Sequence, residues 1–224
     1  MMIFNDSEIV RSWEINAAPW IKAIQNKEIE SRNLITNQAI IDIILAAQPR
    51  RVLDIGCGEG WLSKELVARD IVVFGIDAIP SLVHNAKQMV NAQFDICKYE
   101  DLSDYKFKDQ FDLLVCNFSL IGKESTESVI EAAENLLNRG SKLIIQTLHP
   151  VIASGDLPYE SGWRPGSWVG FSPDFKAPAP WYFRTIEDWC GLFNEYGFLV
   201  ANIYEPIHPK TRKPASIIFD CVPK

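Results

Sequence analysis

The segment 52–61 constrains the fold of this chain more than any other part of its sequence. An apolar run that contains an acid leads directly into three glycines at alternate positions, Gly56, Gly58 and Gly60. Residues 61–69 then carry apolar side chains at helical spacing. Glycine tolerates positive φ angles and lets the backbone approach a ligand closely. The pattern therefore predicts a strand, a tight ligand-binding turn and the start of a helix, whereas the alternative is an ordinary tight turn.

The glycine spacing differs from that of the dinucleotide-binding turn. That fingerprint is G-x-G-x-x-G, and it opens onto a helix whose N-terminus binds pyrophosphate. Here Gly60 comes one residue early, and Trp61 stands where the fingerprint has its last glycine. The spacing therefore disfavours a nicotinamide-dependent dehydrogenase.

Strand-like runs alternate with helical patterns along the rest of the chain. The run 111–117 is almost continuously apolar, which is typical of a strand buried on both faces. Further runs occupy 71–77, 94–96 and 142–147, and a helical pattern at 186–196 precedes two strands at 198–204 and 216–222. This order predicts an α/β fold that closes on a hairpin-like pair.

The motif D-x-G-x-G-x-G at 54–60 closely resembles the first motif of class I S-adenosylmethionine-dependent methyltransferases. A second run ends in an acid, Asp77, 17 residues after Gly60. The resemblance covers roughly residues 40–224. It implies a three-layer Rossmann-like sheet that is mostly parallel with an antiparallel C-terminal hairpin, and S-adenosylmethionine as the cofactor.

The resemblance also implies the residues that hold the cofactor. The glycine turn would pack against the methionine part, and Asp54 would help to hold its amino group. Asp77 would accept hydrogen bonds from the ribose hydroxyls, as the acid after the second strand does in nucleotide-binding folds. Asp95 and Ile96 would meet the adenine, although a surface acid is the alternative there. The expected cofactor-binding set is Arg32, Asp54, Gly56, Cys57, Gly58, Gly60, Asp77, Ala78, Asp95, Ile96 and Cys116.

Cys116 ends the strand pattern 111–117, where the family usually contributes a backbone carbonyl to the methionine end of the cofactor. A catalytic thiol is the rival interpretation, but nothing electropositive lies nearby in the sequence to lower the pKa of this cysteine. We therefore expect Cys116 to be buried and structural.

Residues 1–48 precede the first strand and are expected to form a helical leader. The stretches 12–20 and 30–32 resemble the leader of one bacterial subset of these methyltransferases, in which it covers the cofactor. Arg32 would then pair with the cofactor carboxylate, because a guanidinium binds a carboxylate with two hydrogen bonds. The alternative is an arginine on the surface of a helix.

Residues 149–184 are long for a connection between a strand and a helix. Long loops are functional, structured or disordered, and disordered segments are poor in aromatic residues. This segment is rich in aromatic residues and holds six prolines. We expect an ordered cap that forms a wall over the acceptor, as part of one domain spanning 1–224. His149, directly after the fifth strand, is the candidate proton acceptor, whereas the alternative is a residue that caps the strand.

Composition narrows the class of partner. A formal net charge of −7 argues against a protein that grips a phosphate backbone, so nucleic acid is an unlikely partner. No apolar run reaches 18 residues, so no membrane span is expected. The five cysteines form no C-x-x-C pair and predict reduced thiols in a cytoplasmic protein. Three widely separated histidines give no support for a metal site.

These observations predict a metal-independent methyltransferase that acts on a small molecule. A sulfonium is already an activated donor, so the protein mainly supplies proximity, alignment and a dry site for in-line displacement. The alternatives are other chemistry on the same cofactor, a catalytically silent S-adenosylmethionine-binding protein, and an RNA or protein methyltransferase. The sequence names neither the acceptor atom nor the oligomeric state.

Overall fold

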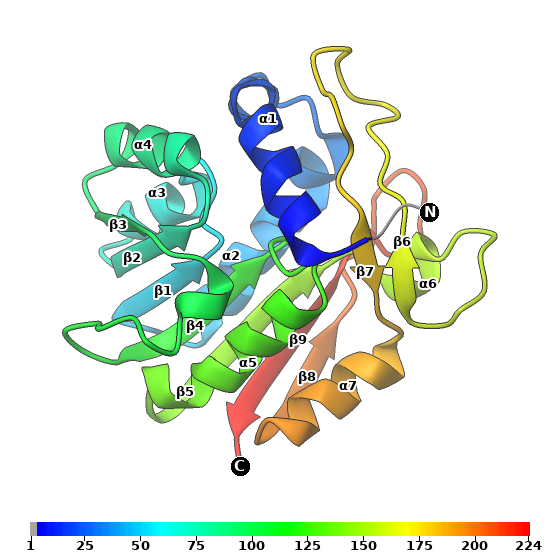
Figure 1. The fold of residues 1–224 in the computed structure, drawn as a ribbon. Helices are drawn as coiled ribbons and strands as arrows, with labels where there is room; N and C mark the ends of the chain where they lie inside the picture. The colour runs from blue at the N-terminus through cyan, green and yellow to red at the C-terminus, as the bar shows by residue number, and fades with distance from the viewer. Residues whose placement is uncertain (1–3) are drawn as a thin grey trace.

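The computed structural model describes residues 4–224 and contains a central sheet with the strand order β3-β2-β1-β4-β5-β9-β8 (Figure 1). Strands β1 to β5 pair in parallel, whereas β9 pairs antiparallel with β5, and β8 with β9. The strands are β1 (Arg51–Ile55), β2 (Val72–Asp77), β3 (Gln93–Ile96), β4 (Phe111–Asn117), β5 (Leu137–Thr147), β8 (Phe198–Tyr204) and β9 (Ile217–Pro223). The predicted α/β fold with an antiparallel C-terminal pair is confirmed.

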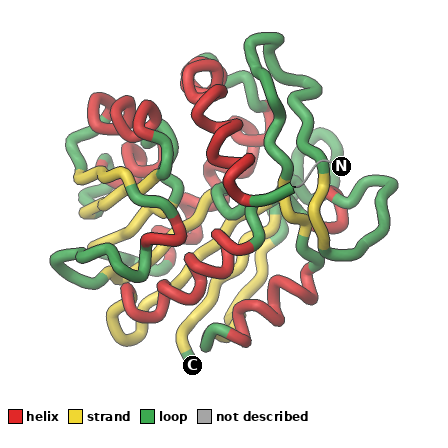
Figure 2. Tube along the Cα trace, viewed as in Figure 1, coloured by secondary structure: helices red, strands yellow, loops and turns green. Residues whose placement is uncertain are grey.

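Helices cover both faces of this sheet, which gives three layers (Figure 2). They are α1 (Asp6–Gln25), α2 (Asn37–Ala46), α3 (Trp61–Val67), α4 (Pro80–Met89), α5 (Glu124–Leu136), α6 (Pro150–Ala153) and α7 (Ile186–Glu195). Two further helical segments are the π-helix η1 (Arg32–Thr36) and the 3₁₀ helix η2 (Tyr99–Asp101). A separate small sheet pairs β6 (Gly162–Arg164) with β7 (Trp181–Phe183).

Strand β4 shows why the central strands are almost continuously apolar. Its Leu114 packs in one cluster with Ile130 of α5 and Phe193 of α7. The next residue, Val115, packs in a second cluster that holds Ile44 of α2. Successive side chains of a strand point to opposite faces, so both faces of β4 are buried and both require apolar residues.

The fifth strand begins earlier than the sequence indicates. Helix α5 ends at Leu136 and β5 follows at once, so residues 137–141 belong to the strand together with the predicted run 142–147. Gly140 there has a φ of +80°. The register between β4 and β5 is irregular in this part of the pair, which accommodates the turn-like residues within the strand.

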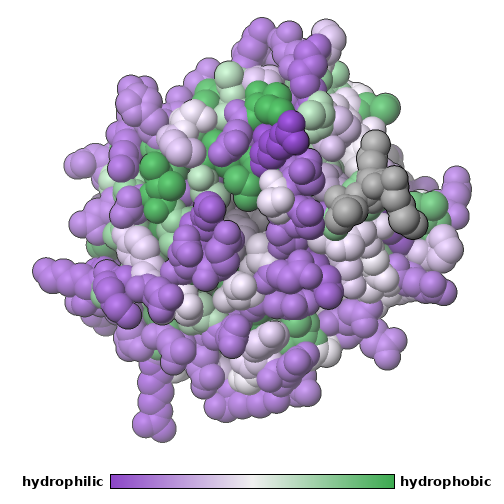
Figure 3. All heavy atoms as spheres, viewed as in Figure 1, coloured by the Kyte–Doolittle hydropathy of each residue, from purple (hydrophilic) through white to green (hydrophobic). Residues whose placement is uncertain are grey.

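Helix α1 is the longest helix of the expected leader and lies across the carboxyl ends of the strands, with the extended part of segment 149–184 beside it (Figure 1). Asn5 caps this helix, since its side chain accepts a hydrogen bond from the Glu8 amide at 3.2 Å. The first three residues of the predicted leader lie outside the described part of the chain. On the face seen in Figure 3 most atoms are hydrophilic, and apolar atoms gather over and beside α1.

Candidate active site

The glycine turn between β1 and α3 adopts a backbone that only glycine adopts easily. Gly56, Gly58 and Gly60 have φ angles of +73°, +56° and +89°. A Cβ atom on Gly56 would lie 2.2 Å from the Tyr99 hydroxyl and 2.4 Å from the Ser119 Cβ. The amide of Gly56 also donates to the Ile76 carbonyl at 2.8 Å. The turn is therefore fixed against the end of β2 and closely packed on its other side.

Asp77 at the end of β2 holds the same turn from the side of the cavity. Its Oδ2 accepts the Gly58 amide and its Oδ1 accepts the Ile79 amide, each at 2.9 Å. Burial raises the pKa of Asp77 to about 6, although both amides oppose that rise. A carboxylate in this position lines the cavity and has lone pairs left to accept ligand hydroxyls.

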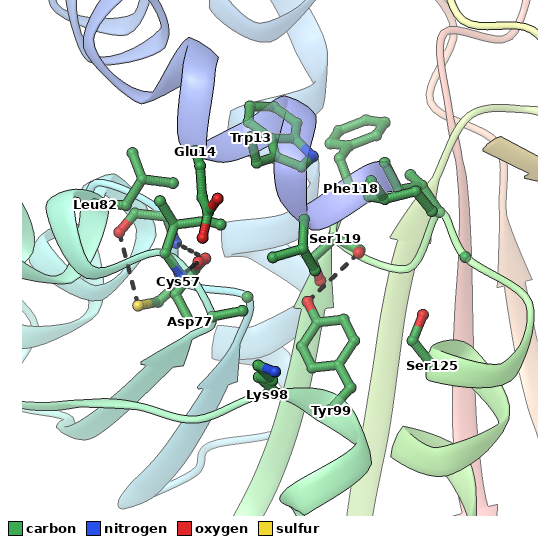
Figure 4. Close-up of a pocket in the computed structure, with 18 of the residues that line it drawn as sticks. Trp13, Glu14, Cys57, Asp77, Leu82, Lys98, Tyr99, Phe118, Ser119 and Ser125 are labelled. Atoms are coloured by element: carbon green, nitrogen blue, oxygen red, sulfur yellow. Dashed lines mark hydrogen bonds between the residues drawn. The ribbon is translucent and has the colours of Figure 1, made fainter. Parts of the chain in front are cut away.

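A cavity of about 350 Å³ opens over the turn, between the strand ends and α1 (Figure 4). In this view Trp13 and Phe118 lie above the cavity and Tyr99 lies below it. Six of the predicted cofactor ligands line it: Arg32, Gly56, Cys57, Gly58, Asp77 and Ala78. The structure thus brings together residues of the leader, the glycine turn and the end of β2.

Three other predicted residues lie beneath this cavity rather than on its wall. Asp54 is 1% exposed and accepts the Ser63 hydroxyl at 2.7 Å, and burial raises its pKa to about 7. Gly60 is packed so closely on α4 that an added Cβ would lie 2.8 Å from the Ala86 Cβ. Cys116 is fully buried, and burial raises its pKa well above the ordinary range, which disfavours a reactive thiolate. These residues support the floor of the site.

Asp95 and Ile96, the residues expected to meet the adenine, do not line this cavity. Asp95 accepts the Tyr105 hydroxyl at 2.6 Å, Ile96 is 50% exposed, and both lie outside the cavity. They end β3, the edge strand, and the chain then turns so that Lys98 and Tyr99 reach the cavity instead. The adenine contact expected of Asp95 and Ile96 therefore stays a prediction.

His149 also lies away from the cavity. Its side chain is 4% exposed, and its Nε2 is 2.7 Å from Glu205 Oε1 in the connection between β8 and β9. The residue is the N-cap of α6, so the chain turns there and directs the imidazole towards that connection. This geometry favours the alternative of a histidine that fixes the loop after β5, and the role of proton acceptor stays a prediction.

The acceptor wall expected of residues 149–184 stays a prediction. All of these residues are described, and none of them lines the cavity. Trp168 instead packs behind the leader, with its ring centroid 6.0 Å from that of Trp13, and Trp163 packs on Tyr182 in the small sheet. The wall itself comes from α1, which carries Trp13 into the cavity.

Glu59, which sequence reasoning missed, forms a buried group with three side chains from separate elements. Its Oε2 accepts the Trp20 indole NH at 2.9 Å. The Arg32 guanidinium lies 4.8 Å from the Trp61 ring centroid and 5.6 Å from that of Trp20. Burial lowers the pKa of Arg32 and raises that of Glu59, while their mutual attraction opposes both changes. The signal that could have identified Glu59 is a charged residue between two glycines of a ligand-binding turn.

Three buried polar atoms on the cavity wall have no hydrogen-bond partner among residues 4–224: Arg32 Nη2, Glu59 Oε1 and Asn117 Oδ1. Unpaired buried charges are costly, so their persistence at one wall points to a ligand that pairs with them. Arg32 and Glu59 both line the cavity, and a guanidinium and a carboxylate are complementary to the carboxylate and ammonium of an amino acid. The residues present therefore fit the methionine part of S-adenosylmethionine.

The described residues give no support to two other kinds of site. Among residues 4–224, no three His, Cys, Asp or Glu side chains gather closely enough to hold a metal ion. No helix in the same range combines the length and hydropathy needed to cross a membrane.

The sheet has the strand order β3-β2-β1-β4-β5-β9-β8, and the cavity lies at the carboxyl ends of its parallel strands. This is the arrangement of the class I methyltransferase fold. A family model described as a methyltransferase domain matches residues 48–165, which is just over half of the chain. The chain therefore belongs to this methyltransferase family, and the predicted family is confirmed, with S-adenosylmethionine as the cofactor that it implies.

Curated relatives match less than half of the chain. The ubiquinone biosynthesis O-methyltransferase of Xylella fastidiosa (strain M23) is 29% identical over 109 residues, covering 46% of this chain and 44% of the relative. The protein of the same name from Xanthomonas oryzae pv. oryzae (strain PXO99A) is 33% identical over 104 residues, covering 44% and 43%. The chain thus spans less than half the length of the curated relatives that it matches.

Solved structures share the fold over almost the whole chain. Magnesium protoporphyrin IX methyltransferase from Synechocystis PCC 6803, solved with S-adenosylhomocysteine, has a TM-score of 0.65 at 20% identity, covering 98% of this chain and 100% of that chain. The 1,6-didemethyltoxoflavin-N1-methyltransferase from Burkholderia thailandensis has a TM-score of 0.65 at 14% identity, covering 94% and 88%. At these identities the likeness concerns the fold alone.

Proposed function

We propose that this protein transfers a methyl group from S-adenosylmethionine to a small, largely apolar or aromatic acceptor. The observation that carries this proposal is that Arg32 and Glu59, both buried beside the glycine turn, each keep one polar atom without a hydrogen-bond partner among residues 4–224. Together with Asp77 they provide a charge pattern that matches an amino-acid head joined to a ribose.

Each of these residues has its own part in holding the cofactor. Arg32 binds the cofactor carboxylate through Nη2, while its Nε is already held by Asn37 at 3.2 Å. Glu59 accepts the ammonium through Oε1, and Asp77 accepts the ribose hydroxyls. Ile79 and Leu82, which line the cavity close to Asp77, present an apolar surface to the base in place of Asp95 and Ile96.

Apolar and aromatic side chains line part of the acceptor end of the cavity. They are Val10 and Trp13 of α1 and Phe118 and Ile121 of the connection after β4, and the polar Asp6, Ser7 and Ser125 line the cavity with them. Phe118 has a φ of +54°, which is uncommon for a bulky residue, and its amide is held by the Gln146 carbonyl at 2.8 Å. Backbone strain of this kind gathers at ligand sites. A flat apolar guest matches these walls.

The chain's own residues align the reactants and exclude water rather than supply a base. When bound, the cofactor supplies a methyl group on a sulfonium, which is an activated donor. His149 lies outside the cavity. Burial raises the pKa of Tyr99 well above its ordinary value, so its hydroxyl stays protonated near neutral pH. We infer a direct in-line displacement, metal-independent, in a dry and aligned site.

Transfer of a radiolabelled methyl group tests the proposal. A small-molecule library, bulk RNA and cell protein serve as parallel acceptors, and the library includes phenols because the curated relatives are named as O-methyltransferases. We expect labelling of small molecules that is lost in Asp77→Ala. Labelling of RNA or protein alone would overturn the acceptor class, and cofactor binding without any turnover would favour a silent binding protein.

A further inference from the structure

Helix α1 forms hydrogen bonds to three separate parts of the molecule. At its start, the Asp6 carboxylate accepts the Lys123 amide at 3.0 Å and the Ser125 amide at the beginning of α5. Near its end, Trp20 donates to Glu59 of the glycine turn at 2.9 Å. A helix of 20 residues is about 30 Å long, so α1 spans the cavity from the acceptor end to the cofactor end.

The third contact joins α1 to segment 149–184. Asn16 is fully buried, and its side chain pairs with both backbone groups of Lys176: Oδ1 accepts the amide at 2.8 Å and Nδ2 donates to the carbonyl at 2.7 Å. Ser12 adds a hydrogen bond from its hydroxyl to the Ala177 carbonyl at 2.6 Å. Ala177 itself has a φ of +40°, a conformation that persists only where the surroundings fix it.

This contact bears directly on the acceptor wall. The Lys176 carbonyl accepts hydrogen bonds from both the Asn16 side-chain amide and the Trp168 indole NH, the latter at 2.9 Å. Trp168 packs edge-on against Trp13, and Trp13 lines the cavity. The position of Trp13 therefore depends on a segment that does not itself reach the cavity.

We infer that Asn16 is a positioning residue that joins residues 171–178 to α1, so that the two form one lid over both ends of the cavity. The inference rests on the proposed function. A ligand bound by Arg32 and Glu59 fixes Glu59, and Glu59 holds Trp20 at one end of α1. Asn16 lies one helical turn before Trp20 on α1, so it passes that restraint to the backbone of Lys176, and occupancy of the cofactor site orders the segment behind the acceptor wall.

Hydrogen exchange measured by mass spectrometry, with and without S-adenosylhomocysteine, tests this coupling. In the parent protein we expect the ligand to slow exchange in a peptide covering 171–178 by about 5- to 150-fold, the usual range for coupled sites. In Asn16→Ala the ligand still binds, but this slowing is lost. Ser12→Ala, which removes the hydrogen bond to the Ala177 carbonyl and a longer one, 3.4 Å, from the Asn16 amide, gives an intermediate response and serves as the readout if Asn16→Ala does not fold.

The matched control is Gln38→Ala. Gln38 is an exposed amide on α2 that pairs with Asp42 at 2.7 Å and touches neither the cavity nor the lid, so this variant keeps the full response. A parent protein whose exchange at 171–178 ignores bound S-adenosylhomocysteine overturns the inference, as does full slowing in both Asn16→Ala and Ser12→Ala. Calorimetry on the same samples separates this result from failure of the proposed function, in which the parent protein does not bind the ligand and both proposals fall together.

Discussion

Replacing Asp77 with alanine separates ligand binding from the structural role of a buried carboxylate. Asp77 accepts two backbone amides, from Gly58 and Ile79, each at 2.9 Å. Asp112 provides a matched control because it also accepts two backbone amides, from Arg50 and Arg51, each at 3.0 Å. Asp112 lies at the start of β4 rather than at the end of a strand. Both variants therefore lose backbone support, but only Asp77→Ala loses a group that faces the cavity.

The expected loss follows from the hydrogen bonds between the ligand and this carboxylate. A hydrogen bond to a charged group contributes about 1.5–3 kcal/mol, which corresponds to roughly a 10- to 150-fold change in a dissociation constant. We expect calorimetry to show a loss of this size in S-adenosylhomocysteine affinity for Asp77→Ala. Asp112→Ala should bind within about twofold of the parent protein, because distant sites act almost independently. Both variants should unfold at a lower temperature in the absence of ligand.

Two results would refute this reasoning. If Asp112→Ala weakens binding as much as Asp77→Ala does, then the loss reflects general destabilisation of the sheet ends. If Asp77→Ala binds S-adenosylhomocysteine like the parent protein, then the carboxylate is not the ribose ligand, and its role is limited to holding the turn.

Three further predictions concern other residues of the site and its surroundings. Arg32→Met keeps an apolar chain between the two tryptophans but loses the guanidinium, so calorimetry should show S-adenosylhomocysteine affinity reduced by about 10- to 150-fold; unchanged affinity would remove Arg32 from the site. Asp54 has a folded-state pKa of about 7 against an ordinary value of 3.8, so the folded state binds its proton more tightly than the unfolded state does, and its contribution to stability is lost as pH rises from about 4 to 7. Denaturant titrations should therefore show a steeper decline over that range for the parent protein than for Asp54→Asn, and parallel profiles would contradict the assignment. His149→Ala should lower the free energy of unfolding by about 1–3 kcal/mol through loss of the buried contact with Glu205, while S-adenosylhomocysteine affinity stays unchanged; selective loss of turnover at parental stability would restore His149 to the site.

The fold and the cofactor turn were predictable because their signals are local. The run 111–117 matches β4 residue for residue, since a strand buried on both faces leaves few alternatives to continuous apolar residues. The glycines at 56, 58 and 60 predict the turn, because each has a positive φ that other residues adopt at a cost. Asp77 follows from its place at the end of the next strand.

The remaining features depend on side-chain direction and on distant contacts. Asp95 lies near the end of β3 and His149 just after β5, but their side chains contact Tyr105 and Glu205, and neither residue lines the cavity. Segment 149–184 has the composition of a cap, and only the tertiary structure shows that α1 lies between it and the cavity. The electrostatic attraction between Arg32 and Glu59 links a leader residue to the glycine turn. Nothing in the sequence spacing of these two residues indicates that they lie close together.

A crystal structure with S-adenosylhomocysteine bound tests the central claim most directly. The account predicts that the amino-acid head lies between the Arg32 guanidinium and the Glu59 carboxylate, with the ribose hydroxyls on Asp77. It also predicts that the sulfur faces the space between Trp13 and Phe118. A ligand whose head group contacts neither Arg32 nor Glu59, or a protein that takes up NAD but not S-adenosylhomocysteine, would contradict it.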